Sequence, residues 1–210
     1  MKAEFWHDRW EANQIGFHKD VANPLLIAHL PALGLAAGDR VFVPLCGKTL
    51  DIPWLLDQGY RVAGAELSAI AVEQLFAEMG VEPEVTNAGP LTRYSADGVE
   101  IFAGDIFDLT AEALGKVDAV YDRAALVALP ADMRARYAGH LAEITGGAQQ
   151  LLITFGYDQS QMDGPPFSVP PEEVERHYAG SYAMQVAERG PVTGGLKGVV
   201  AAEETVWVMG

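Results

Sequence analysis

The sequence RVFVPLCGKTLDIPWLLDQGYRVAGAE, residues 40–66, decides the fold that we expect for this chain. Residues 40–44 form a short apolar run, which suits a strand buried on both faces of a parallel sheet. Gly47 permits a tight loop after this strand. A helix then ends at Gly59, and residues 61–65 are the next strand. The stretch therefore predicts one strand–loop–helix–strand unit of an α/β fold.

Glu66 stands at the carboxyl end of the second predicted strand. In an open parallel sheet, ligands bind beyond the carboxyl ends of the strands. A carboxylate about 20 residues after the first strand–helix turn is placed to accept both ribose hydroxyls of a nucleoside. The alternative is that Glu66 only caps the helix that follows it. The position favours a nucleoside ligand.

Two nucleotide-binding motifs nearly match here and fail. Gly47-Lys48-Thr49 resembles the end of a GxxxxGK[ST] loop, but the leading glycine of that motif is replaced by Phe42. The GxGxxG pattern is also absent. A loop with one glycine makes a poor pyrophosphate cradle, and it suits a ligand without phosphates, such as S-adenosylmethionine.

Composition narrows the possible partners. The chain has 210 residues, which we expect to form a single domain, and its net charge of −15 argues against nucleic acid and anionic membranes as partners. The single cysteine, Cys46, and the spacing of the five histidines predict no metal site. No signal-like or membrane-spanning run is present, so we expect a cytoplasmic protein, and the acidic surface favours a monomer.

Aromatic side chains dominate the start of the chain. Trp6 and Trp10 stand four residues apart on one face of a predicted helix, and Phe17 follows a glycine in a predicted loop. Residues 1–30 are either a surface helix docked by two tryptophans or a lid segment with a lead-in helix. In a lid, the aromatic rings would close over a flat or cationic ligand.

Three further candidates lie after predicted strands. Asp105-Ile106 follows the strand at residues 99–103, and either brackets an adenine or forms a helix-entry loop. Arg123 follows the strand at residues 117–121, and either serves the site or pairs with a nearby aspartate, Asp122 or Asp105. Phe167 lies in a stiff proline-rich loop, where it either flanks a substrate or packs the loop.

The end of the chain distinguishes between nucleotide-binding folds. A fifth strand is expected at residues 151–155, and two late strands at 182–186 and 199–209 should pair antiparallel across a turn. A small β insertion is expected near residues 91–94. The result is a seven-stranded, mostly parallel sheet with one reversed strand. Nicotinamide-binding folds usually lack the reversed hairpin, whereas adenosylmethionine-dependent methyltransferases have it.

From about residue 6 to residue 170 the chain resembles the bacterial thiopurine S-methyltransferases. The resemblance rests on segments that keep their order, namely WHDRW, Phe17-His18, VPLCGKTLD, GAELS, GDIFDL, YDRAALVALP, LLITFGYD and GPPFSVP. It implies a Rossmann-like class I fold and S-adenosylmethionine as the cofactor. It also implies the following contacts: Trp10, Leu45, Glu66 and Arg123 with the cofactor, Asp105-Ile106 with its adenine, and Phe17 with the substrate.

The resemblance implies methyl transfer to a sulfur acceptor, either a thiol or a thiopurine, and the family label also covers selenium and tellurium species. A thiolate is a strong nucleophile and needs no dedicated base, so Arg123 would act by stabilising the anionic acceptor. Gly194 stands where family members often have an arginine, and Lys197 is a candidate substitute. Two alternatives stay open: another small-molecule acceptor, or a non-catalytic module that binds an adenosine ligand.

Overall fold

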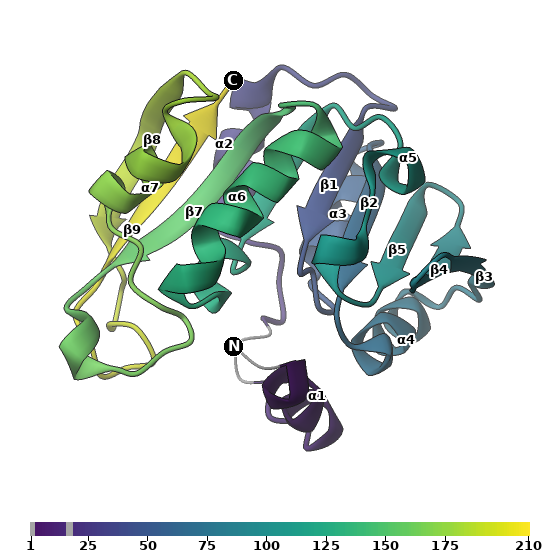
Figure 1. Cartoon of the computed structure of the whole chain (residues 1–210), viewed down its shortest axis with the longest axis horizontal. Helices are drawn as coiled ribbons and strands as arrows, with labels where there is room; N and C mark the ends of the chain where they lie inside the picture. Colours follow the sequence, from purple (N-terminus) through teal and green to yellow (C-terminus); the bar gives the residue numbers. More distant parts are fainter. Residues whose placement is uncertain (1–2, 16–18) are drawn as a thin grey trace.

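A computed structural model describes residues 3–15 and 19–210, and its centre is a nine-stranded mixed sheet (Figure 1). The strand order across the sheet is β3-β4-β5-β2-β1-β6-β7-β9-β8. In chain order the strands are β1 (Arg40–Pro44), β2 (Arg61–Glu66), β3 (Glu84–Ala88), β4 (Leu91–Ala96), β5 (Val99–Ala103), β6 (Ala119–Arg123), β7 (Gln149–Gly156), β8 (Met184–Pro191) and β9 (Glu203–Met209).

The parallel centre of the sheet reverses its strand order beside β1. From β1 the chain proceeds outward through β2 to β5, and it then returns to place β6 on the other side of β1. All four pairings among β5, β2, β1, β6 and β7 are parallel. The carboxyl ends of β1 and β6 are therefore the switch point at which open α/β sheets bind their ligands.

The expected count of seven strands with one reversed strand is wrong, because the sheet has nine strands and two of them run against the rest. The additional pair is the β3–β4 hairpin, of which the sequence predicted only a small insertion near residues 91–94. β3 is mostly exposed, so its sequence lacks the apolar alternation by which strands are recognised. The reversed strands are β4 and β9, each antiparallel to its inner neighbour.

The boundaries of several other strands also differ from those predicted. The fourth predicted strand, at residues 117–121, is β6 and extends to Arg123. Of the two late strands, β8 is longer than predicted and ends at Pro191, whereas β9 is shorter and begins only at Glu203. The intervening loop contains several glycines, and positive φ angles at three of them keep the chain out of an extended conformation.

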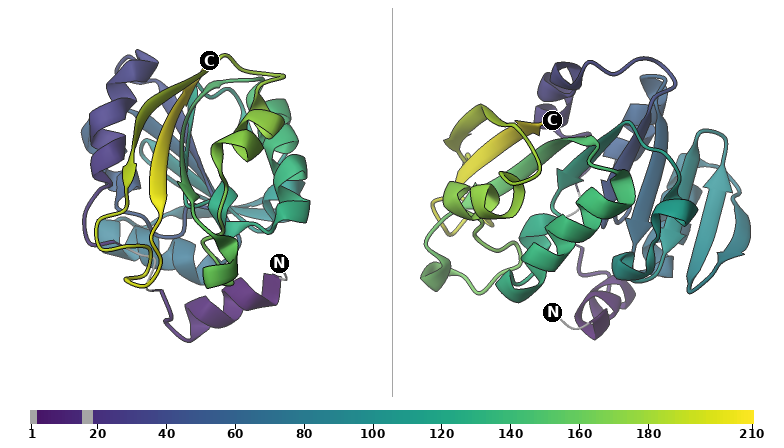
Figure 2. Two further views of the ribbon diagram at one scale, coloured as in Figure 1. Left: turned by 90° about the vertical axis from the view of Figure 1, so that its left-hand side faces the viewer. Right: turned by 45° about the horizontal axis from the view of Figure 1, so that its top comes forward.

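Helices cover both faces of the sheet. The helices are α1 (Ala3–Glu11), α2 (Pro24–His29), α3 (Asp51–Asp57), α4 (Ala69–Met79), α5 (Ala111–Leu114), α6 (Ala131–Thr145) and α7 (Pro171–Tyr178). Short 3-10 turns are η1 (Leu30–Leu33), η2 (Ile106–Asp108), η3 (Leu126–Ala128) and η4 (Gln159–Gln161). Figure 2 shows, in its left view, α2 on one side of the sheet and α6 on the other. Within the described residues, no helix is long and apolar enough to cross a membrane.

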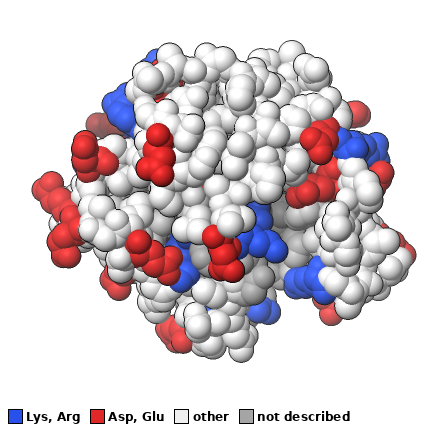
Figure 3. All heavy atoms as spheres, turned by 180° about the vertical axis from the view of Figure 1, so that it is seen from behind, with Lys and Arg blue, Asp and Glu red and all other residues white. Residues whose placement is uncertain are grey.

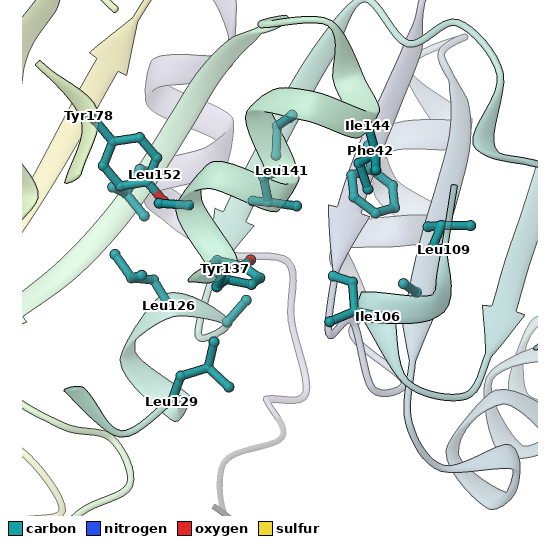
Figure 4. Packing of buried hydrophobic residues seen from close by; sticks show 14 of the residues in the cluster. Phe42, Ile106, Leu109, Leu126, Leu129, Tyr137, Leu141, Ile144, Leu152 and Tyr178 are labelled. Carbon is teal, nitrogen blue, oxygen red and sulfur yellow. The ribbon is translucent and has the colours of Figure 1, made fainter. Parts of the chain in front are cut away.

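Each face of the sheet has its own apolar core, because successive residues of the central strands point to opposite sides. Phe42 of β1 packs on the α6 side, while its neighbours Val41 and Val43 pack on the side of α2 and α3. Figure 4 shows Tyr137 and Leu141 of α6 in the core that contains Phe42. Complete burial of side chains of this size contributes about 1.5–3 kcal/mol each relative to exposure. The central strands are therefore held rigidly from both sides.

Helix α1 belongs to neither layer. It lies beyond the carboxyl ends of the parallel strands (Figures 1 and 2). Trp10 at its carboxyl end is nevertheless only 4% exposed. The helix thus covers the edge of the sheet at which the predicted site lies.

Candidate active site

The loop after β1 is held in an unusual backbone conformation. Leu45 has a φ of 46°, which is uncommon for a residue with a side chain, and Gly47 has a φ of 53°. The N–H of Cys46 donates to the carbonyl of Ala65 at 3.0 Å and so ties the loop to β2. Ala124, directly after β6, also has a positive φ of 64°. Two strained residues therefore flank the switch point, and backbone strain of this kind gathers at ligand sites.

Glu66 closes this loop onto the end of β2. Its two carboxylate oxygens accept hydrogen bonds from the N–H groups of Gly47 and Ser68, each at 2.8 Å. The side chain is 6% exposed, and burial raises its pKa, while the backbone N–H bonds act in the opposite direction. The Ser68 bond is the helix-end contact that the sequence offered as an alternative role. Because a carboxylate oxygen accepts more than one hydrogen bond, this contact leaves capacity for a ligand.

Trp10 packs directly on the same loop. A Cβ atom added to Gly47 would lie 3.2 Å from the indole Cζ2 atom, so glycine is the residue that permits this close approach. Trp10 thereby joins α1 to the loop that Glu66 holds. The resemblance implied that Trp10 and Leu45 contact the same ligand. In the structure Leu45 lies in this loop and Trp10 packs against it.

In the turn after β5, Asp105 is exposed to solvent whereas the side chain of Ile106 is buried. Asp105 is exposed, and one of its carboxylate oxygens accepts the N–H of Phe107 at 3.0 Å. The side chain of Ile106 is buried in the core on the α6 side, and its carbonyl accepts a hydrogen bond from His140 Nε2 at 2.8 Å. The turn is therefore fixed by α6, and the carboxylate of Asp105 is its accessible polar group.

Asp122 and Arg123 at the end of β6 point to opposite faces of the sheet. Asp122 is fully buried and accepts hydrogen bonds from the Tyr137 hydroxyl at 2.8 Å and the Leu126 N–H at 3.1 Å. Burial raises the pKa of Asp122 to about 6, against the effect of these bonds. Asp122 thus fixes the turn η3 that follows Arg123.

Arg123 itself lies on the opposite face, at the mouth of the predicted site. It is partly exposed, and in residues 3–15 and 19–210 its guanidinium has no ion pair or hydrogen bond. The alternative, a salt bridge to Asp122 or Asp105, is not formed among the described residues: Asp122 lies on the other face of the sheet, and the carboxylate of Asp105 accepts the N–H of Phe107. Its donors are therefore available to a ligand.

A hydrogen-bonded chain that the sequence did not predict attaches the N-terminal segment to the site. Asp51 at the start of α3 accepts the Tyr121 hydroxyl at 3.0 Å and the backbone N–H of Asn23 at 2.6 Å. Tyr121 lies two residues before Arg123 on the same strand, and so faces the same side. The spacing of Tyr121 and Arg123 is visible in the sequence, but the pairing of Tyr121 with Asp51 is not. In the structure Asp51 anchors Asn23, the residue directly before α2.

The substrate-side candidates are only partly described. Phe167 is partly exposed, and its N–H donates to the carbonyl of Val127 in η3 at 2.6 Å, so its loop is fixed next to the turn that follows Arg123. Phe17 lies outside the described residues. Lys197 is exposed in the loop between β8 and β9, with a positive φ of 52°, and Gly194 precedes it in the same loop.

The amino-terminal edge of the sheet has a cavity and a group of ion pairs of its own. A cavity of about 160 Å³ lies at the amino-terminal edge, where Glu100 pairs with both Arg40 and Arg93. This edge is opposite to the switch point, and the ion pairs there join β5 to β1 and to β4.

Figure 3 shows one face of the molecule, with acidic side chains spread over it and basic ones in separate groups. Within the described parts of the chain, no group of three or more histidine, cysteine, aspartate or glutamate side chains could hold a metal ion.

Solved structures share this arrangement of strands and define the class. The 1,6-didemethyltoxoflavin-N1-methyltransferase of Burkholderia thailandensis matches with a TM-score of 0.67 at 14% identity, over 99% of this chain and 86% of the other. The magnesium protoporphyrin IX methyltransferase of Synechocystis PCC 6803 matches with a TM-score of 0.65 at 14% identity, over 99% of both chains. The fold is that of class I S-adenosylmethionine-dependent methyltransferases, as expected.

Sequence comparison identifies the family within that class. The family model of thiopurine S-methyltransferase matches residues 1–209. The thiopurine S-methyltransferase of Xanthobacter autotrophicus is 60% identical over all of this chain and 99% of its own length. That of Teredinibacter turnerae is 54% identical over 99% of this chain and 96% of its own length. This chain belongs to the thiopurine S-methyltransferase family, whose members are S-adenosylmethionine-dependent enzymes.

Proposed function

We propose that this protein transfers the methyl group of S-adenosylmethionine to the sulfur of a small heteroaromatic thiol of the thiopurine kind. The site would lie between the loop after β1, the end of β6 and helix α1. The observation that carries the proposal is the guanidinium of Arg123 at the switch point, which has no ion pair or hydrogen bond within the described residues and lies on the face opposite to the buried Asp122. A fixed cation with free donors suits an anionic sulfur acceptor.

The residues present fit the cofactor. The carboxylate of Glu66 stands at the end of β2 with hydrogen-bonding capacity left for ribose hydroxyls. The exposed oxygen of Asp105, with Ile106 beside it, would contact the adenine. Leu45 lies in the loop after β1, and Trp10 packs on the same loop. S-Adenosylmethionine supplies the methyl group as a sulfonium.

The side chains of this protein would act mainly by positioning. A thiolate needs no dedicated base, so the rate would depend on holding the acceptor sulfur in line and within about 3–3.5 Å of the methyl carbon. Arg123 would hold the acceptor through its anionic sulfur and could also contact the cofactor. Phe17 and Phe167 would flank the acceptor ring. The N-terminal residues 1–30 would serve as the lid segment and its lead-in helix.

A turnover screen with radiolabelled S-adenosylmethionine tests the proposal. The acceptors are 6-mercaptopurine, an aliphatic thiol, selenite and tellurite, each assayed with the wild-type protein and with Arg123→Ala. We expect the largest kcat/KM for 6-mercaptopurine and a loss of this activity in the variant. Binding of S-adenosylhomocysteine without methylation of any acceptor would contradict the proposal and favour a non-catalytic module.

Other properties belong to the same proposal. We infer that residues 1–210 act as one methyltransferase domain that works as a monomer in the cytoplasm, with no nucleic-acid partner. The net charge of −15 supports the last point, because it repels a polyanion. Size-exclusion chromatography with light scattering would measure the oligomeric state.

A further inference from the structure

Glu204 of β9 lies on the same face of the sheet as Arg123. In the sheet register, Arg123 and Val206 are both opposite Ile153 of β7. Glu204 is two residues before Val206, and so points to the same side. Because β9 is antiparallel to β7, its beginning lies at the carboxyl ends of the parallel strands. Glu204 therefore stands at the same edge as the proposed acceptor site.

The pKa of Glu204 reflects the charged groups around it. Burial raises this pKa and Glu188 of β8 adds to the rise, whereas the positive charges of Arg123 and Lys19 act against it. The pKa of Tyr121, raised mainly by burial, responds to the charges of both Arg123 and Glu204. A cavity of about 50 Å³ adjoins Glu204, and it is lined also by Leu25 of α2, by Glu188, Gly190 and Pro191 of β8, and by Val206 of β9. Leu25 and Val206 belong to the core on the side of α2 and α3, so this cavity lies on the face of the sheet to which Arg123 points.

Glu204 differs from the other carboxylates near the site in having no partner. It is partly buried, yet among the residues that the structure describes neither carboxylate oxygen accepts a hydrogen bond or forms an ion pair. Glu66, Asp51 and Asp122 all accept hydrogen bonds. The adjacent Glu203, on the other face of β9, pairs with Arg189 at 2.6 Å. A partly buried carboxylate whose oxygens accept no other hydrogen bond is available to a ligand that supplies a donor.

We propose that Glu204 is a specificity-determining residue that accepts a hydrogen bond from a ring N–H of the acceptor, while Arg123 faces the sulfur. This inference rests on the proposed methyl transfer to sulfur, and it narrows the substrate class. The preferred acceptor is a nitrogen heterocycle with a ring N–H near its sulfur. Aliphatic thiols lack this donor, and acceptors that carry a carboxylate or another anionic group are repelled by Glu204.

Three thiols of graded chemistry test this assignment. 6-Mercaptopurine offers ring N–H donors, thiophenol offers neither donor nor additional charge, and 4-mercaptobenzoate carries a carboxylate. The variants are Glu204→Gln, which removes the charge, and Glu204→Leu, which also removes the acceptor. Glu203→Gln is the matched control, because it makes the same change one residue away on the opposite face.

The measured quantity is the ratio of kcat/KM values for two acceptors with one protein preparation, which is independent of the folded fraction. We expect the ratio of 6-mercaptopurine to thiophenol to fall by about tenfold in Glu204→Gln and further in Glu204→Leu, as for loss of hydrogen bonds to a charged group. The ratio of 4-mercaptobenzoate to thiophenol should rise in both variants. Both ratios should be unchanged in Glu203→Gln.

Two results would overturn the inference in distinguishable ways. If the wild-type protein methylates these thiols but both ratios stay within twofold in the Glu204 variants, Glu204 does not select the acceptor, and the proposed function stands. If the wild-type protein methylates none of the thiols while it binds S-adenosylhomocysteine in calorimetry, the proposed function fails, and the role of Glu204 fails with it.

Discussion

Replacing Glu66 with glutamine tests how the cofactor loop is held. The side chain keeps its size but exchanges one acceptor oxygen for an NH₂ donor. In the wild-type protein the two oxygens accept the N–H groups of Gly47 and Ser68, each at 2.8 Å. In Glu66→Gln only one of these N–H groups finds an acceptor, and the other faces the new donor. The variant should therefore loosen either the loop or the start of α4.

The structure sets the expected magnitude of this change. An unsatisfied buried N–H costs about 1–3 kcal/mol, and a hydrogen bond to a charged group contributes about 1.5–3 kcal/mol. Burial raises the pKa of Glu66, so removing its charge recovers part of the loss. We expect the free energy of unfolding to fall by about 1–3 kcal/mol. The affinity for S-adenosylhomocysteine should fall by about tenfold to a hundredfold, since the ribose would lose a charged acceptor.

Urea unfolding and isothermal titration calorimetry measure the two effects separately. Glu78→Gln is the control, because Glu78 is exposed and pairs with Lys48 of the same loop at 2.6 Å. An exposed ion pair contributes at most about 1 kcal/mol, so this variant should keep both its stability and its affinity. The reasoning is refuted if Glu66→Gln unfolds like the wild-type protein and binds S-adenosylhomocysteine within threefold of it. Loss of stability with unchanged affinity would leave Glu66 as a structural residue only.

Three further predictions concern other parts of the site. Arg123→Lys, which keeps the charge and loses the planar fork of donors, should lower kcat/KM, and Arg123→Ala should lower it more, while the melting temperature of both changes little; unchanged kcat/KM would exclude Arg123 from the site. Burial raises the pKa of Asp122 to about 6, so between about pH 6 and pH 4 the native protein binds a proton that the unfolded chain does not. Relative to Asp122→Asn, the wild-type protein should therefore become more stable by roughly 3 kcal/mol as the pH falls through this range, and a pH-independent difference in urea unfolding would contradict this. Removal of residues 1–18 should leave a folded protein without activity, and Gly47→Ala, which crowds Trp10 at 3.2 Å, should partly reproduce the loss; full turnover of the truncated protein would show that the segment is not a lid.

The parts of the fold that the sequence predicted are those set by short-range patterns. The apolar run at residues 40–44 is β1 as predicted, because burial on both faces leaves a continuous apolar signature. Glu66 could be placed since its distance from the first turn follows from the length of one helix and one strand. Arg123 could be placed at the switch point for the same reason, although its strand extends two residues beyond the prediction.

The parts that the sequence did not predict depend on contacts between distant residues. Asp51 binds Asn23, 28 residues away, and Tyr121, 70 residues away, and no local pattern reports such a pairing. Glu204 lies in β9, and its position on the same face and at the same edge as Arg123 is apparent only from the register of β6, β7 and β9. The β3 strand is mostly exposed and is stabilised by pairing with β4, which the alternation of apolar residues does not reveal.

The charges of the proposed reaction favour a site that a lid closes and that has no dedicated base. Transfer of a methyl group from a sulfonium to a thiolate neutralises one positive and one negative charge, so the transition state is less polar than the reactants. Water stabilises the separated charges and thereby raises the barrier. Trp10, 4% exposed on the Gly47 loop, and the Asn23–Asp51 bond hold the N-terminal segment over this edge of the sheet. Excluding water there would favour the transition state directly. Loss of the lid should therefore reduce kcat more than it raises KM, whereas a segment that only recruited the acceptor would change KM alone.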